Sequence, residues 1–146
     1  MKGLQEEQVL KSVVAVTGTK LWTGANWTIN SLPSFLEGAS LYPLPWEKHQ
    51  EGLKISVVAG ESATVYIAYA NQKGWPKGKL FDCGFEESKD HPPISTSRFT
   101  LYNTYKKRAN AGEKLELPPT EPVGSKYVRI ALFIKKGKFI VNRIFL

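Results

Sequence analysis

One stretch decides the fold of this chain: Ala63-Thr64-Val65-Tyr66-Ile67-Ala68-Tyr69. Its β-branched and aromatic residues are typical of strands. Because successive side chains of a strand point to opposite faces, the stretch has two faces of different composition. The first face carries Val65, Ile67 and Tyr69, and the second carries Thr64, Tyr66 and Ala68. A half-buried strand is therefore predicted here.

Similar short runs lie between scattered glycines and prolines. Tyr127–Ile134 alternates in the same way, and Phe139–Phe145 follows it after a short turn, which predicts a C-terminal hairpin over about residues 127–146. A proline just inside the start of Leu32–Gly38 and a glycine at its end predict at most one helical turn there. The remaining predicted strands are Val9–Thr17, Leu21–Ile29, Leu53–Val58, Arg98–Tyr105 and Lys114–Leu117.

The length and composition fit one globular domain that spans residues 1–146. About eight short strands separated by turns are typical of a sandwich or barrel. We therefore expect an all-β fold: a single β-sandwich or jelly roll of about eight antiparallel strands with little or no helix.

Charge and cysteine content narrow the classes of function. The net charge of +7 favours anionic partners through long-range steering. The single cysteine, Cys83, has no intrachain disulfide partner, and a buried structural thiol is expected. No apolar run reaches the roughly 18 residues of a membrane-spanning helix, and the N-terminus lacks the apolar region of a signal peptide.

Motifs for catalysis or for a cofactor are missing from the sequence. The Gly-x-Ser-x-Gly nucleophile elbow and the phosphate-binding glycine loop do not occur. The potential zinc ligands His49, His91 and Cys83 lack a zinc-site spacing. We expect no enzyme activity, no cofactor and no metal, although an acidic cluster leaves a structural calcium open against a plain solvated loop. The cluster is Asp82, Glu86, Glu87 and Asp90.

Several segments, in this order, resemble a known family of modules. They are Leu21-Trp22-Thr23, Asn26-Trp27-Thr28, Leu32-Pro33, Leu36-Glu37-Gly38, Ala63–Tyr69, Phe99-Thr100-Leu101-Tyr102 and Ala111–Leu117. Their order is similar to that of the accessory β-sandwich modules, with a galactose-binding-like jelly-roll fold, of many secreted bacterial polysaccharide-degrading enzymes. The resemblance covers about residues 18–134. It implies sugar binding and an extracellular setting, whereas the residues themselves leave the localisation open.

The chain departs from the family pattern at two turns. Gly24-Ala25 and Asn71-Gln72 stand where the family often has charged pairs, so a ligand role of those charges is not carried over. Aromatic rings in turns stack on sugar faces. We therefore expect a binding site in end loops, with Arg98 as a hydrogen-bonding partner. Its residues are Tyr42, Trp46, Asn71, Trp75 and Arg98.

Competing interpretations of these residues remain open. Trp46 and Trp75 could instead plug the open end of the sandwich, and Trp22 and Trp27 are expected in the core because they lie on strand-like segments. The first hypothesis for function is a non-catalytic carbohydrate-binding module. The alternative is a protein-interaction or scaffold domain of a larger assembly, in which Phe139–Leu146 docks a neighbour.

Nucleic acid or an anionic membrane ranks last as a partner. Its sequence basis would be two short basic clusters, Tyr105–Arg108 and Lys135–Lys138, which we expect in solvated turns or as edge protection. Ligand identity, oligomeric state and whether the chain is part of a larger protein cannot be read from the residues.

Overall fold

The computed structural model describes most of the chain. The described residues are 6–9, 11–23, 26–45, 54–59, 61–69, 82–88, 92–98, 100–101, 103–116, 122–123, 126–127, 130–135 and 139–145. The all-β prediction is confirmed. Within these ranges no helix is long and apolar enough to cross a membrane.

The described strands are short, and most join distant parts of the sequence. Their bounds are β1 (Glu6–Val9), β2 (Val13–Val14), β3 (Trp22–Thr23), β4 (Ile29–Ser31), β5 (Ser40–Tyr42), β6 (Leu44–Pro45), β7 (Lys54–Ala59), β8 (Ala63–Tyr69), β9 (Glu86–Ser88), β10 (Ile94–Thr96), β11 (Thr100–Leu101), β12 (Asn103–Ala109), β13 (Lys114–Glu116), β14 (Pro122–Val123), β15 (Lys126–Tyr127), β16 (Ile130–Lys135) and β17 (Phe139–Phe145). The helical turn predicted within Leu32–Gly38 is confirmed as the 3-10 turn η1 (Ser34–Leu36).

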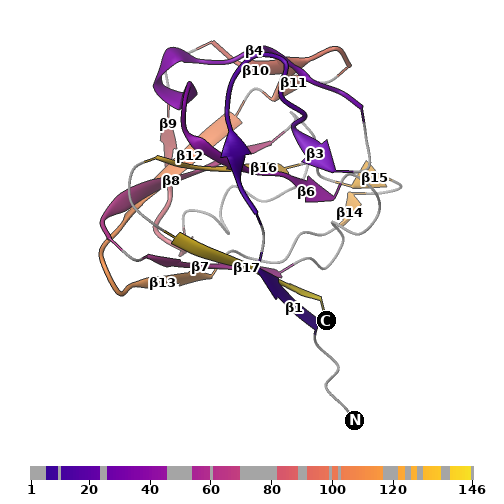
Figure 1. Ribbon diagram of the computed structural model, residues 1–146. Helices are drawn as coiled ribbons and strands as arrows, with labels where there is room; N and C mark the ends of the chain where they lie inside the picture. Colours follow the sequence, from indigo (N-terminus) through magenta and orange to yellow (C-terminus); the bar gives the residue numbers. More distant parts are fainter. Residues whose placement is uncertain are drawn as a thin grey trace.

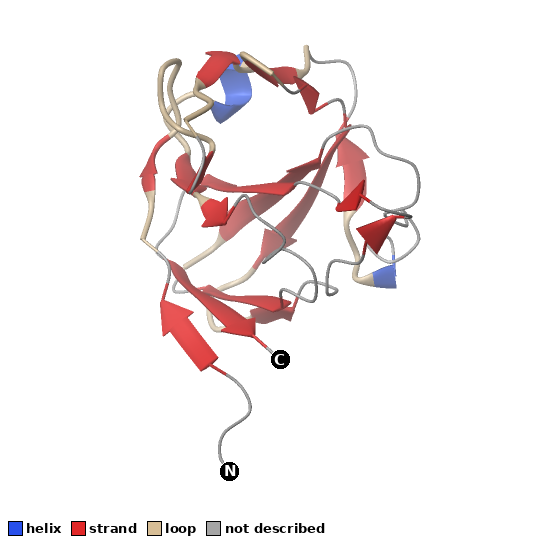
Figure 2. Ribbon diagram, turned by 90° about the vertical axis from the view of Figure 1, so that its right-hand side faces the viewer, coloured by secondary structure: helices blue, strands red, loops and turns tan. Residues whose placement is uncertain are grey.

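Three sheets form the layers of the molecule. A six-stranded sheet has the order β2-β5-β16-β8-β12-β9, a four-stranded sheet β1-β17-β7-β13, and a three-stranded sheet β11-β10-β4. The six-stranded sheet lies between the other two (Figures 1 and 2). The small pairs β14-β15 and β3-β6 complete the fold, and β3 and β6 run parallel. The sandwich architecture is therefore confirmed.

The two faces predicted for Ala63–Tyr69 exist and are packed differently. Val65 and Ile67 are fully buried on the face that we call the inner face. On the opposite, outer face, the ring of Tyr66 meets that of Phe35 of η1, with ring centroids 5.2 Å apart. The outer face therefore packs in part against η1, and Tyr66 itself stays half-buried.

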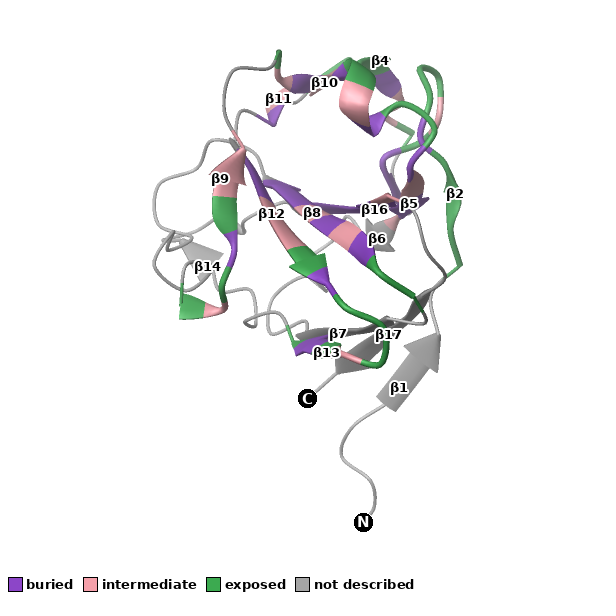
Figure 3. Ribbon diagram, turned by 90° about the vertical axis from the view of Figure 1, so that its left-hand side faces the viewer, coloured by how far each residue is buried: buried purple, intermediate pink, exposed green. Residues whose placement is uncertain are grey.

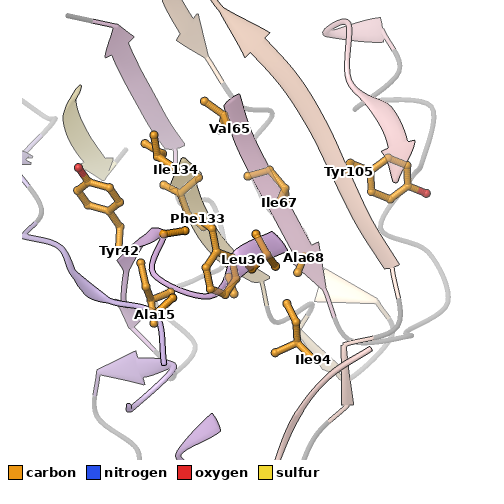
Figure 4. Close-up of a cluster of buried hydrophobic side chains, with 14 of the residues drawn as sticks. Ala15, Leu36, Tyr42, Val65, Ile67, Ala68, Ile94, Tyr105, Phe133 and Ile134 are labelled. Atoms are coloured by element: carbon orange, nitrogen blue, oxygen red, sulfur yellow. The ribbon is translucent and has the colours of Figure 1, made fainter. Parts of the chain in front are cut away.

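Apolar side chains fill both sides of the central strand β16. Its residues Ala131, Leu132, Phe133 and Ile134 are all buried, as expected for a strand covered on both faces. Figure 4 shows Phe133 close to Leu36, on the side that η1 covers. Toward its edges the same sheet becomes more exposed, as the colours along β12 show in Figure 3.

The predicted C-terminal hairpin is wrong. β16 pairs with β5 and β8, whereas β17 pairs with β1 and β7 in the other large sheet. Both segments have the apolar, strand-like composition of a sandwich, and such a composition is compatible with pairing in one sheet or with a crossover between two. The crossover also places β17 between two strands, with both of its edges paired.

The basic cluster Tyr105–Arg108 lies within a strand instead of a solvated turn. β12 extends to Ala109, paired with β8 along its whole length and with β9 on its other side. Tyr105 and Ala109, four residues apart on the same face of β12, are both buried. Their burial anchors the strand segment that contains the basic cluster. Alternation then sends Lys106 and Arg108 to the outer face, and Lys107 to the inner one.

Candidate functional site

Tyr42, expected in an end loop, lies on strand β5 and packs into the core. It stands opposite Leu132 of β16 and is 8% exposed. Burial raises the pKa of its phenol, and a hydrogen bond with the Ser12 side chain opposes that shift. The loop placement of Tyr42 is therefore wrong, and its ring offers no open face for stacking. The prolines that follow Tyr42 suggested a loop, whereas Ser40–Tyr42 forms β5.

Three further residues of the predicted site lie outside the described part of the chain. They are Trp46, Asn71 and Trp75. Their role in binding stays a prediction.

Arg98 is exposed, as expected, and lies beside a tryptophan that the sequence placed in the core. Its guanidinium carbon is 5.8 Å from the ring centroid of Trp27, which is within cation–π range. Trp27 is half-buried, whereas Trp22 is 1% exposed and confirmed as a core residue. We refer to Trp27 and Arg98 as the indole–guanidinium pair.

The register of the three-stranded sheet brings this pair together. Thr96 of β10 stands opposite Ile29 of β4, and the two strands run antiparallel. Arg98 follows Thr96 by two residues and Trp27 precedes Ile29 by two, so the two side chains meet just beyond the paired strands. The backbone N–H of Arg98 donates to Oγ1 of Thr96 at 3.2 Å, which orders the bend after β10.

Backbone hydrogen bonds hold the other half of the pair. The carbonyl of Trp27 accepts from the N–H of Leu21 at 3.4 Å, and the N–H of Ile29 donates to the carbonyl of Thr19 at 2.9 Å. The N–H of Gly18 donates to the carbonyl of Ile29 at 2.8 Å, in a turn where Gly18 has a φ of 93°. Such a φ favours glycine. Trp27 is thus held on a hydrogen-bonded backbone, and its side chain packs in part against the core.

The pair combines two kinds of recognition. An indole ring offers a flat apolar surface with a polar N–H, and a guanidinium offers several donors in a fixed plane. Hydroxyl-rich ligands with apolar C–H faces match this combination. Sequence patterning missed Trp27 because a tryptophan between strand-like residues is more often buried.

Carboxylates and the thiol show no metal-site geometry in the described residues. Glu86 and Glu87 are adjacent on β9 and therefore point to opposite faces. Across the described ranges no group of three metal-ligating side chains is brought together, and Asp90 lies outside them. Cys83 is a free, half-buried thiol at the margin of the core, less buried than predicted.

A lysine of the six-stranded sheet contacts the segment that leads into β9. Nζ of Lys107 donates to the carbonyl of Cys83 at 2.8 Å. Gly84 follows with a φ of 91°, and a Cβ there would lie 3.0 Å from the same Nζ. Glycine and lysine therefore fit together at the point where the chain enters β9.

Comparison with known proteins links the fold to carbohydrate-active enzymes. No protein-family model and no curated protein matches the sequence. A solved β-glucuronidase from glycoside hydrolase family 2 matches 94% of this chain with a TM-score of 0.63 and 15% identity. A family 138 glycoside hydrolase targeting pectin rhamnogalacturonan II matches 91% of it, with a TM-score of 0.63 and 16% identity.

These identities show a shared fold and no more. The chain spans 14% of the length of the first enzyme and 16% of the second, so the likeness concerns one part of each. The chain therefore has a β-sandwich fold that is also found within glycoside hydrolases.

Proposed function

We propose that this chain is a non-catalytic carbohydrate-binding β-sandwich module whose described binding surface is the indole–guanidinium pair. The observation that carries the proposal is the half-buried Trp27 with the guanidinium carbon of the exposed Arg98 5.8 Å from its ring centroid. The indole stacks against the C–H face of a sugar, and the guanidinium donates to its hydroxyl oxygens.

The fold comparison supports a carbohydrate-related role. Two solved structures that share the fold are glycoside hydrolases, and only a small part of each corresponds to this chain. A module of this kind holds a polysaccharide near a catalytic unit. The ligand, the setting outside the cell and the absence of catalysis all belong to this proposal, because fold alone does not determine them.

A glycan-array screen tests the proposal, with wild-type protein, Trp27→Ala and Trp75→Ala side by side at low and physiological salt. We expect a saturable, salt-resistant signal that Trp27→Ala abolishes. Lys114→Ala is the matched control for charge, since Lys114 is exposed and lies in the four-stranded sheet, where it pairs only loosely with Glu116 at 3.6 Å. A silent array, or a signal that Trp27→Ala leaves unchanged, contradicts the proposal for this surface.

Protein docking is a second candidate function, and one observation favours it. Val13, Val14 and Val16 are 42%, 60% and 40% exposed, and β2 is an edge strand of the six-stranded sheet. Exposed apolar edges attract partner strands. Phe139–Leu146, the segment first considered for docking, instead contributes β17 between two strands. Light scattering over a range of protein concentrations detects self-association, and Val14→Lys should abolish it.

A further inference from the structure

Basic residues that lie far apart in the sequence meet on the outer face of the six-stranded sheet. Thr64 of β8 stands opposite Arg108 on one side and opposite Lys135 on the other. Residues directly opposite in antiparallel strands share a face. Lys106, two residues before Arg108, shares that face and stands opposite Tyr66. We call Lys106, Arg108 and Lys135 the basic face.

The three cations are open to ligands to different degrees. Arg108 is exposed, and Lys106 and Lys135 are half-buried. Within the described part of the chain none of the three forms an ion pair with a carboxylate. Glu86 of β9 stands opposite Lys106. One carboxylate therefore borders the three cations, and the net charge of the group stays positive.

The spacing suits a ligand with repeated acidic groups. Strands lie about 4.8 Å apart, so the positions of Arg108 and Lys135, which flank β8, are separated by about 10 Å. Lys106 and Arg108, two residues apart on one strand, are separated by about 6.8 Å. The cations thus form a triangle across three strands that a single small anion cannot span.

Neutral polar groups lie between the cations. The hydroxyl of Thr64 and the phenol of Tyr66 occupy the strand between them, and both residues are half-buried. Phe35 supports the ring of Tyr66 at 5.2 Å between centroids. The hydroxyl of Tyr66 is protonated at neutral pH and able to donate, and burial raises its pKa further above the ordinary 10.0.

From this juxtaposition we propose that the basic face binds a polyuronate, an acidic polysaccharide whose carboxylates pair with Lys106, Arg108 and Lys135. Its hydroxyls meet the uncharged groups of Thr64 and Tyr66. The choice of a glycan rests on the proposed function, and the choice of an acidic one rests on the charge of this face. Nucleic acid fits less well, because tight phosphate binding draws on more cations than the three gathered here.

The test measures the affinity for polygalacturonate and for its fully methyl-esterified form, which keeps the sugar backbone and replaces each carboxylate with an uncharged methyl ester. We expect the wild-type protein to bind the acid form and to lose most of that binding on esterification and at high salt. In the Lys106→Gln, Arg108→Gln double variant we expect affinity for the acid form to fall about tenfold, since each partly exposed pair contributes modestly. The Lys11→Gln, Lys114→Gln double variant removes the same charge elsewhere and should bind like wild type.

Three results overturn the proposal: equal binding of both polymer forms, wild-type affinity in the Lys106→Gln, Arg108→Gln variant, or stronger binding to single-stranded DNA than to polygalacturonate. A circular-dichroism spectrum and a melting curve confirm that the variants fold. If the double variant does not fold, the single variant Arg108→Gln is tested in its place. Trp27→Ala separates this proposal from the broader one. It should abolish binding of neutral glycans and leave the charge-dependent part of polygalacturonate binding intact.

Discussion

The two faces of the six-stranded sheet are built from the same strands and differ in how far several of their side chains are buried. Along β8, Val65 and Ile67 are fully buried, whereas Thr64 and Tyr66 stay half-buried. Along β12, Lys107 turns its amine inward to a backbone carbonyl, and Arg108 on the next position is exposed. A single period-two pattern therefore supplies both the core and a candidate surface.

The difference in burial between the two faces predicts where substitutions alter stability and where they alter binding. Inner-face residues are held by packing from two layers, so their substitution is expected to alter stability. The outer-face residues Thr64 and Arg108 are more exposed, so their substitution is expected to alter binding more than stability. Matched substitutions on neighbouring positions of one strand separate the two effects.

The largest expected effect is on the inner face. Ile67→Ala removes a fully buried side chain and leaves a cavity, so we expect the free energy of unfolding to fall by about 2–5 kcal/mol. Thr64→Ala, on the outer face of the same strand, should cost less than about 1 kcal/mol. Urea denaturation followed by tryptophan fluorescence measures both. Equal losses would contradict the assignment of the two faces.

A smaller effect is expected at the loop end before β9. Lys107→Met keeps most of the aliphatic stem and removes the hydrogen bond to the carbonyl of Cys83, and we expect a loss of about 1–2 kcal/mol. Arg108→Met, its neighbour on the outer face, should change stability by less than about 0.5 kcal/mol. If the two variants unfold at the same denaturant concentration, the Lys107 contact does not hold the loop.

The sequence was sufficient to predict the strands whose residues alternate, and insufficient to predict which strands pair with them. Ala63–Tyr69 was predicted with its bounds and faces because its period of two is unbroken. The pairing of β16 and β17 could not be predicted, since an amphipathic strand fits either sheet of a sandwich. Tyr42 is buried instead of lying in a loop, and Trp27 is only partly buried, because composition shows that a ring is apolar whereas the strand register decides which neighbours cover it.

The two tyrosines provide a comparison that depends on pH. Burial raises the pKa of Tyr42 on the inner face and of Tyr66 on the outer face above the ordinary 10.0. Each folded tyrosine then holds its proton more tightly than the unfolded one. The resulting stability is fully present below pH 10 and is lost as the pH rises from there through the folded pKa.

We therefore expect the free energy of unfolding to decline above pH 10, and to decline less steeply in Tyr42→Phe and in Tyr66→Phe than in wild type. Denaturation at a series of alkaline pH values measures the slopes. A variant slope equal to that of wild type would show that the corresponding phenol is not desolvated by folding.

The smallest expected effect on stability is at the indole–guanidinium pair. Arg98→Gln removes an exposed cation near a half-buried ring, for which we expect a loss of about 0.5 kcal/mol. Its effect on glycan affinity should be the larger one, because the guanidinium is proposed to donate to the ligand. Calorimetric titration with the best array ligand measures that affinity. A stability loss without an affinity loss would make Arg98 a purely structural residue.

Nuclear magnetic resonance of the indole N–H groups tests the central claim most directly. The chain has four tryptophans and therefore four indole signals, which single Trp→Phe variants assign. On titration with a glycan identified on the array, the account predicts that the signal of Trp27 shifts and saturates while that of the buried Trp22 stays in place. A fixed Trp27 signal at saturating glycan would contradict binding at this surface, and shifts confined to Trp46 or Trp75 would move the site to the loops predicted from the sequence.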